Sequence, residues 1–142
     1  MLNQSKQSLV LQCTQQFYVA VLALSFLPSI VIAGVQVNTI DPAAVLAEND
    51  RHLSVSGPIA CTQGQHADIE VTITQRQTGA VAFGRTRVLC TGYIQHWEAR
   101  ANSHGKNTFQ VGQATAVAMA TTSTRGTTDD AHLWLVNITV TN

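Results

Sequence analysis

Apolar and polar residues alternate along much of this chain, most regularly between His66 and Gln75. The apolar side of that stretch carries Ile69, Val71 and Ile73, and the polar side carries Asp68, Glu70, Thr72 and Thr74. A period of two over this length is typical of a strand with one buried face. Because a Thr78-Gly79 turn follows, the pattern predicts a hairpin whose second strand leads to Cys90.

The same alternation predicts further strands before and after this hairpin. One begins near Leu53, and Gly57-Pro58 is expected to bend or end it. In a second strand, one face is expected to carry Tyr93, Gln95, Trp97, Ala99 and Ala101. A third has Ala114, Ala116, Ala118 and Ala120 on one face and Thr115, Val117 and Met119 on the other. The last strand is expected to point Trp134, Val136, Ile138 and Val140 inward. The total of about seven strands, spaced by roughly ten residues with turn signals between them, is typical of a β-sandwich.

Two segments depart from this regular pattern. The parity of the apolar residues in the return strand changes between Phe83 and Val88, and Gly84 lies at the change, so we expect a β-bulge at Gly84. Nearer the N-terminus, residues 35–38 are expected to form a first edge strand and residues 42–47 a short helical turn.

The cysteines constrain the fold further. Cys13 precedes an apolar leader and would be removed with it, which leaves Cys61 and Cys90 as an even pair. In an exported chain such a pair favours a disulfide, worth roughly 3 kcal/mol for a loop of this length, and two buried free thiols are the alternative. The predicted fold class is all-β, an immunoglobulin-like antiparallel β-sandwich of about seven strands with one disulfide, after an N-terminal signal peptide.

The N-terminal segment has the features of an export signal. Residues 17–33 are almost wholly apolar, Lys6 precedes them, and Pro28 with the small residue Ala33 suits cleavage after Ala33. An uncleaved anchor is the alternative, because the apolar run is just long enough to span a bilayer. We therefore expect a signal peptide over 1–33, a lead-in over 34–50 and a sandwich domain over 51–142. The protein is expected to be secreted or held in the cell envelope, with membrane contact only through an uncleaved leader.

Charge excludes one class of partner. The chain has eight Lys and Arg residues against eight Asp and Glu, and charged residues make up 11% of it. A near-neutral surface gives no long-range attraction for nucleic acid. We therefore expect no nucleic-acid partner.

The titratable residues do not form a recognisable catalytic motif. His66 with Asp68 and Asp130 with His132 are short pairs that could share an ion, which keeps a metal-binding sandwich enzyme as the last alternative. Asp68 and Glu70 would lie about 7 Å apart on one strand face, but that face is polar and solvated, unlike a glycosidase site. We expect no enzyme activity, no cofactor and no bound metal.

Four residues are the candidates for contact with a partner. Arg85 and Arg87 lie on the predicted hairpin arm, and Leu133 and Leu135 face outward if Trp134 faces the core. The preferred interpretation is a secreted or surface-displayed, non-enzymatic binding or structural module, whose partner is an unknown protein or an envelope or surface component.

The alternative from a different class is a secreted inhibitor of a hydrolase. Two predicted loops, 102–107 and 124–130, would present the basic residues Lys106 and Arg125 at projecting tips. Loops of this kind can enter an active site, and changing either residue would then abolish inhibition.

Several segments carry a resemblance to a known group of proteins. They are Val55-Ser-Gly-Pro-Ile-Ala-Cys61-Thr, Val71-Thr-Ile-Thr-Gln75, Cys90-Thr-Gly92 and Trp97. In these features the chain resembles small exported bacterial proteins, chiefly actinobacterial and of unknown function, that carry one immunoglobulin-like domain after a signal peptide. The resemblance implies a disulfide between Cys61 and Cys90, Trp97 packed near it and an extracellular location, and it implies no particular activity.

Overall fold

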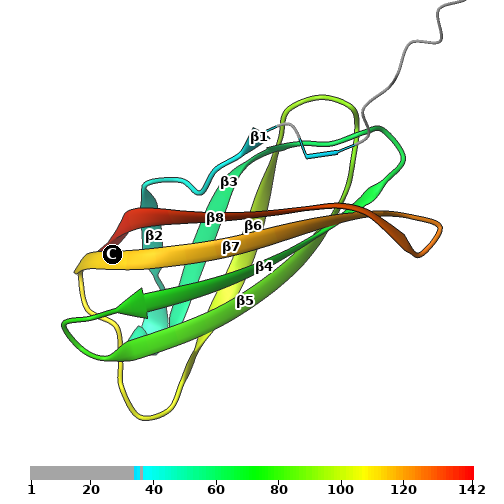
Figure 1. Ribbon diagram of the computed structural model, residues 1–142. Coiled ribbons are helices and arrows are strands. Elements are labelled where there is room, and N and C mark those ends of the chain that lie inside the picture. Colours follow the sequence, from blue (N-terminus) through cyan, green and yellow to red (C-terminus); the bar gives the residue numbers. More distant parts are fainter. Residues whose placement is uncertain (1–33, 36) are drawn as a thin grey trace, which may run out of the picture. The chain divides into compact units, whose positions relative to one another are not determined.

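The computed structural model describes residues 34, 35 and 37–142, which form eight strands and one three-residue 3-10 helix (Figure 1). The elements are β1 Val37–Asn38, β2 Ala43–Leu46, η1 Glu48–Asp50, β3 His52–Ala60, β4 His66–Gln75, β5 Ala80–Leu89, β6 Gln95–His104, β7 Gly112–Thr124 and β8 Thr127–Thr141. The predicted signal peptide over 1–33, with Cys13, lies outside the described residues. Within the described part, no helix is long and apolar enough to cross a bilayer.

Seven of the strands pair into a closed ring. The order is β3-β2-β8-β7-β4-β5-β6, and β6 pairs back onto β3 over eight residue pairs. All these pairings are antiparallel except that between β2 and β8, which is parallel. The short β1 joins the edge of β3 outside the ring. The all-β prediction is therefore confirmed, but the sheet is closed, whereas an immunoglobulin-like sandwich has two separate sheets.

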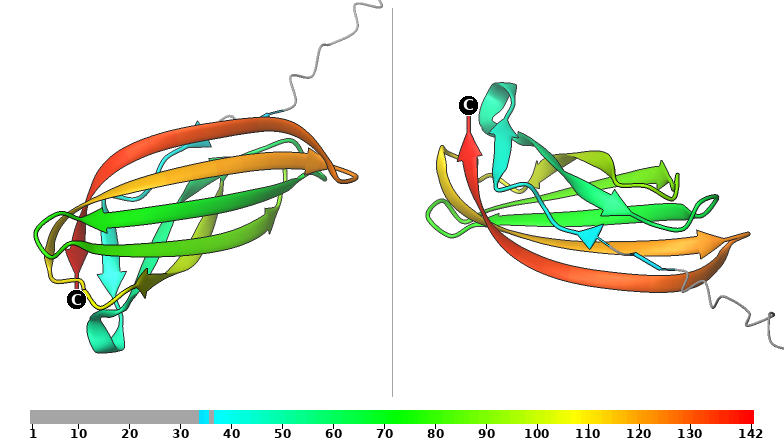
Figure 2. Two further views of the ribbon diagram at one scale, coloured as in Figure 1. Left: turned by 60° about the horizontal axis from the view of Figure 1, so that its bottom comes forward. Right: turned by 90° about the horizontal axis from the view of Figure 1, so that it is seen from above.

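The ring is joined only partly at two corners. β5 pairs with β6 only over Val81–Gly84, and β8 pairs with β2 only over Thr139–Thr141. Both corners lie at the same end of the long strands, which we call the closed end (Figure 2). Towards the other end, the open end, the four-stranded layer β8-β7-β4-β5 and the layer formed by β3 and β6 share no strand pairing among the described residues.

The disulfide links the two layers at the open end. Cys61 follows β3 and Cys90 follows β5, and their sulfur atoms are bonded, which confirms the predicted pairing. The backbone amide of Cys90 donates to the carbonyl of Gln65, and the amide of Gly64 donates to the carbonyl of Cys90. Trp97 on β6 is 1% exposed and belongs to the same core cluster as both cysteines. The covalent bond therefore closes the corner that the strand pairing leaves open.

The core follows the alternation that the sequence shows. The predicted faces of β4, of β6 from Trp97 onward and of the alanine row of β7 are all turned inward. On β8, Ile138 and Val140 are fully buried, while Trp134 and Val136 are partly buried against the core. Tyr93 is exposed, because it lies in the turn before β6 rather than in the strand.

The predicted bulge at Gly84 is wrong. β5 pairs with β4 in unbroken register through Gly84, and Val81 and Phe83 point outward while Ala82 and Gly84 point inward. A Cβ atom on Gly84 would lie only 3.0 Å from the Cα of Ala101 on β6. Position 84 therefore requires glycine because the β5 and β6 backbones approach closely there, and not because a bulge inserts an additional residue. The register shift in the sheet lies elsewhere, at positions 122 and 123 of β7.

Two further local predictions are also wrong. Residues 43–46 of the expected helical turn form β2, because they find backbone partners on both β3 and β8, and strand pairing outweighs the helix propensity of alanine. Gly57-Pro58 does not end β3, which continues to Ala60. Pro58 is tolerated because β1 and β2 pair with β3 only at positions 59–60 and 53–54, so no second strand requires an N–H group at position 58. Residues of the lead-in, 34–50, thus supply β1 and β2.

Candidate functional site

The outer face of the layer β8-β7-β4-β5 carries an exposed apolar surface. Leu133 and Leu135 are 68% and 63% exposed, as predicted for residues that flank an inward Trp134. In the sheet register Leu133 lies opposite Met119 and Leu135 opposite Val117. We call these four residues the apolar face. The row through Leu135 and Val117 continues across Thr72 to Phe83 on β5, which is also exposed.

A cluster of ion pairs lies on the same outer face, on β4 and β5. Arg87 donates to both oxygens of Asp68, from Nε at 2.7 Å and from Nη2 at 2.8 Å. Arg85 lies 3.6 Å from Asp68 and 3.7 Å from Glu70. The hydrogen bond from Arg87, followed by the charges of Arg87 and Arg85, lowers the pKa of Asp68 against the opposing effect of partial burial. The carboxylates of Asp68 and Glu70 thus form ion pairs with the arginines of the neighbouring strand.

The sheet brings the four predicted contact residues onto one face. One row of the register runs from Leu133 through Met119 and Glu70 to Arg85. Arg87 lies one row further towards the open end. The arginines lie on β5 and the leucines on β8, at opposite edges of the layer. The surface therefore has a charged half at β5 and an apolar half at β8.

The two predicted inhibitory residues lie at opposite ends of the fold. Lys106 is in the loop between β6 and β7 at the closed end, and Arg125 is in the turn between β7 and β8 at the open end. The thirteen residues of β7 separate them, a length of about 40 Å. They cannot contribute to a single small site.

The two short histidine pairs differ in their contacts. His132 Nε2 lies 3.4 Å from Asp130 Oδ2, and Asp68 next to His66 is engaged by Arg87. Among the residues that the structure describes, no group of three His, Cys, Asp or Glu side chains is placed to hold a metal ion.

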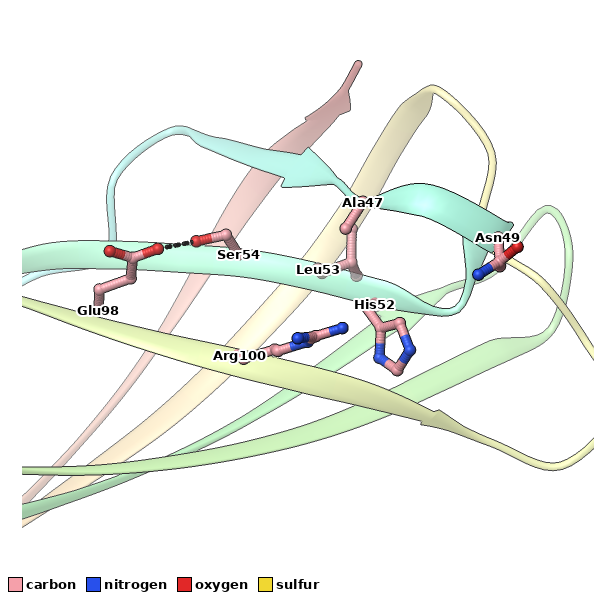
Figure 3. A pocket seen from close by; sticks show the side chains of 7 residues that line it. All are labelled: Ala47, Asn49, His52, Leu53, Ser54, Glu98 and Arg100. Carbon is pink, nitrogen blue, oxygen red and sulfur yellow. Dashed lines mark hydrogen bonds between the residues drawn. The ribbon is translucent and has the colours of Figure 1, made fainter.

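A polar cavity that the sequence did not reveal lies on the outer side of β3 and β6 (Figure 3). It has a volume of about 380 Å³ and is lined by Ala47, Asn49, His52, Leu53, Ser54, Glu98 and Arg100. Ser54 donates a hydrogen bond to Glu98, and His52 Nδ1 lies 2.7 Å from Asn102 Oδ1. Sequence reasoning missed this cavity because residues 49–54 and 98–100 meet only through the β3–β6 pairing, for which the local pattern gives no signal.

No family model matches the chain, and the search of the curated proteins finds no match either.

Proposed function

We propose that the chain is an exported, non-enzymatic binding or structural module that contacts a protein or an envelope component through the apolar face. The observation that carries this proposal is the exposure of Leu133 and Leu135 side by side on β8. In this proposal the ring of strands serves as an immunoglobulin-like sandwich does, as a rigid support for a binding surface. The disulfide is consistent with an oxidising, extracellular compartment.

Burial of the apolar face supplies the driving force for contact. Leu133, Leu135 and Met119 of the apolar face are each more than a third exposed, and contiguous exposed apolar residues of this kind mark interaction sites. Removal of that surface from water favours association in proportion to the area buried. The neighbouring ion pairs of Arg85 and Arg87 form a polar border that would fix the orientation of a partner rather than its affinity.

A double substitution tests the apolar face directly. We expect the Leu133→Ser and Leu135→Ser double variant of the full chain to lose its partner in pull-downs from the host's own envelope fraction. Val111→Ser is the matched control, because Val111 is also an exposed apolar residue but lies in the loop before β7. Equal capture by the wild type, the double variant and the control would refute the proposal. Unchanged unfolding midpoints would show that both variants remain folded.

The alternative hypothesis, a secreted inhibitor of a hydrolase, rests on one residue, Arg125. Arg125 has a φ of 51° and forms the tight turn between β7 and β8 with Gly126, so its side chain is presented at the tip of a long hairpin. If this tip inhibits a hydrolase, Arg125→Ala should abolish the inhibition and Lys106→Ala, at the other end of β7, should not. The absence of inhibition by the wild type across a panel of proteases and glycosidases would dispose of this alternative.

A further inference from the structure

The cavity on β3 and β6 has no role in the proposed contact surface, which lies on the other layer. Three segments build it: residues 47–50 with η1, β3 itself and β6. Its volume of about 380 Å³ falls within the range of small-molecule sites, about 300–1,000 Å³. A cavity of this size, lined mainly by polar side chains, suits a small hydrophilic ligand.

One end of the cavity offers donors for an anion. Arg100 takes no part in the four ion pairs found among the described residues. Glu98, two residues away on the same strand face, accepts a hydrogen bond from Ser54 instead. Figure 3 shows the Arg100 guanidinium pointing towards the ring of His52, with Asn49 beyond it at the loop end of the cavity. A guanidinium group in this position can bind a carboxylate through two parallel hydrogen bonds.

Two further groups can recognise hydroxyls, Glu98 at the far end of the cavity and His52 between Arg100 and Asn49 (Figure 3). A carboxylate has about four lone-pair sites, so Glu98 can accept hydrogen bonds from a ligand while it keeps the one from Ser54. His52 binds Asn102 through Nδ1, and this leaves Nε2 for a ligand. Glu98 also disfavours a dianion at Arg100, because its negative charge lies about 7 Å along the strand. These features favour a singly charged ligand with several hydroxyl groups over a phosphate.

Asn49 lies in η1, where the backbone is left-handed. Asn49 and Asp50 are consecutive residues with φ values of 72° and 53°. Asn and Asp are the non-glycine residues that adopt this region most readily, so the sequence suits the tight turn at this point. Here the conformation places Asn49 in the wall of the cavity.

We propose that this cavity binds an acidic saccharide or a similar polyhydroxy carboxylate. The carboxylate of the ligand lies on Arg100, with Asn49 as a second donor, and its hydroxyls reach Glu98 and His52 Nε2. This inference is independent of the proposed contact through the apolar face, since the two surfaces belong to different layers.

Titration of the full chain with D-glucuronate tests the proposal. We expect saturable shifts of the amide signals of Leu53, Ser54 and Arg100 in two-dimensional NMR spectra, with glucuronate at least tenfold tighter than acetate or phosphate and no response to D-glucose. Arg100→Gln should weaken glucuronate binding by about 10- to 100-fold, the usual loss for a charged hydrogen-bonded pair. Arg76→Gln, in the exposed turn between β4 and β5, is the matched control and should leave the affinity unchanged.

Glu98→Ala separates the two halves of the proposed ligand. The substitution removes one of the two hydroxyl acceptors and leaves His52, so glucuronate should lose part of its advantage over acetate while both still depend on Arg100. Acetate or phosphate binding as tightly as glucuronate to the wild type would overturn the proposal. Glucuronate binding that survives Arg100→Gln, or no saturable binding at all, would also overturn it.

Discussion

Arg87 faces Asp68 directly across the β4–β5 pair and donates two hydrogen bonds to its carboxylate, at 2.7 and 2.8 Å. This fork geometry is the main reason that the pKa of Asp68 is lowered; partial burial opposes it, and the charges of Arg87 and Arg85 add to it. The Arg87 side chain is 62% exposed, so solvent screens much of the interaction. The pair therefore fixes the local side chains more than it stabilises the fold.

The first prediction concerns the titration of Asp68. Because its pKa is lower in the folded than in the unfolded chain, the pair stabilises the fold above the unfolded pKa of about 3.9, and this stabilisation is lost as the pH falls through the folded pKa. Arg87→Ala should raise the pKa of Asp68, and the variant should lose less stability on acidification than the wild type. NMR titration of the Asp68 carboxyl carbon measures the first effect, and urea unfolding across the same pH range measures the second.

Arg76→Ala is the control for this prediction. Arg76 is exposed and lies outside the β4–β5 register that joins Asp68 to Arg87, so its removal should leave the titration of Asp68 in place. If Asp68 titrates at the same pH with and without Arg87, the fork geometry does not control this carboxyl.

The second prediction concerns the disulfide at the open end. Cys61 and Cys90 are 29 residues apart, and the chain-entropy model assigns a loop of this length about 3–4 kcal/mol of stability. Because no strand pairing among the described residues joins the layers there, we expect the Cys61→Ala and Cys90→Ala double variant to lose that amount in denaturant unfolding. It should also show faster amide exchange at Gly64 and at position 90, whose amides donate hydrogen bonds in this corner.

The wild type unfolded in the presence of a reductant provides the comparison, because it loses the bond between Cys61 and Cys90 without a change of side chain. Its unfolding midpoint should match that of the double variant. Equal midpoints for the double variant and the wild type under oxidising conditions would show that the bond adds nothing to stability.

The buried strands could be predicted from the sequence because their environment repeats every two residues. Residues 66–75 lie in the middle of a layer with the core on one side and solvent on the other, so the alternation records both surroundings. The same reasoning gave the outward position of Leu133 and Leu135. The disulfide could be predicted because removal of Cys13 with the expected leader leaves two cysteines in a chain read as exported.

Closure of the sheet could not be predicted in this way. It depends on β6 pairing with β3 along one edge and with β5 along the other, and on β2 lying parallel to β8. All three are long-range pairings without a local sequence signature. Gly84 illustrates the limit, since a bulge and a close backbone approach both select glycine. The cavity of Arg100 was invisible for the same reason, because its residues come together only through the β3–β6 register.

The third prediction tests the close approach of β5 and β6. A Cβ atom on Gly84 would lie 3.0 Å from both the Cα of Ala101 and the carbonyl oxygen of Arg100, which are backbone atoms of a paired strand. Gly84→Ala should destabilise the protein by about 1–2 kcal/mol, since overpacking outweighs the entropy gained by removing a glycine. Gly57→Ala should cost more, because its Cβ would lie 2.3 Å from the carbonyl oxygen of Thr39. Urea unfolding of both variants measures this order, and a Gly84→Ala variant as stable as the wild type would contradict it.

The last prediction concerns Gln75, a fully buried polar side chain at the closed end. Its Nε2 donates to the carbonyl of Gln110 at 2.7 Å, and its Oε1 accepts from the Gln110 amide at 2.9 Å and from the Thr78 hydroxyl at 3.1 Å. One side chain thus fastens the loop between β6 and β7 to the turn between β4 and β5. Gln75→Leu keeps the side chain's size but leaves these groups unpaired, so we expect a loss of about 1–3 kcal/mol.

Gln113→Leu separates this effect from a general intolerance of leucine. Gln113 makes a single hydrogen bond to Thr139 from an exposed position on β7, so its replacement should change stability by less than about 0.5 kcal/mol. Hydrogen exchange adds a local measurement, because loss of the Gln75 contacts should expose the Gln110 amide while the amides of β4 stay protected. If Gln75→Leu is as stable as Gln113→Leu and the Gln110 amide keeps its protection, the loop is held by its other contacts, among them the hydrogen bond from the Phe109 amide to the carbonyl of Asp50.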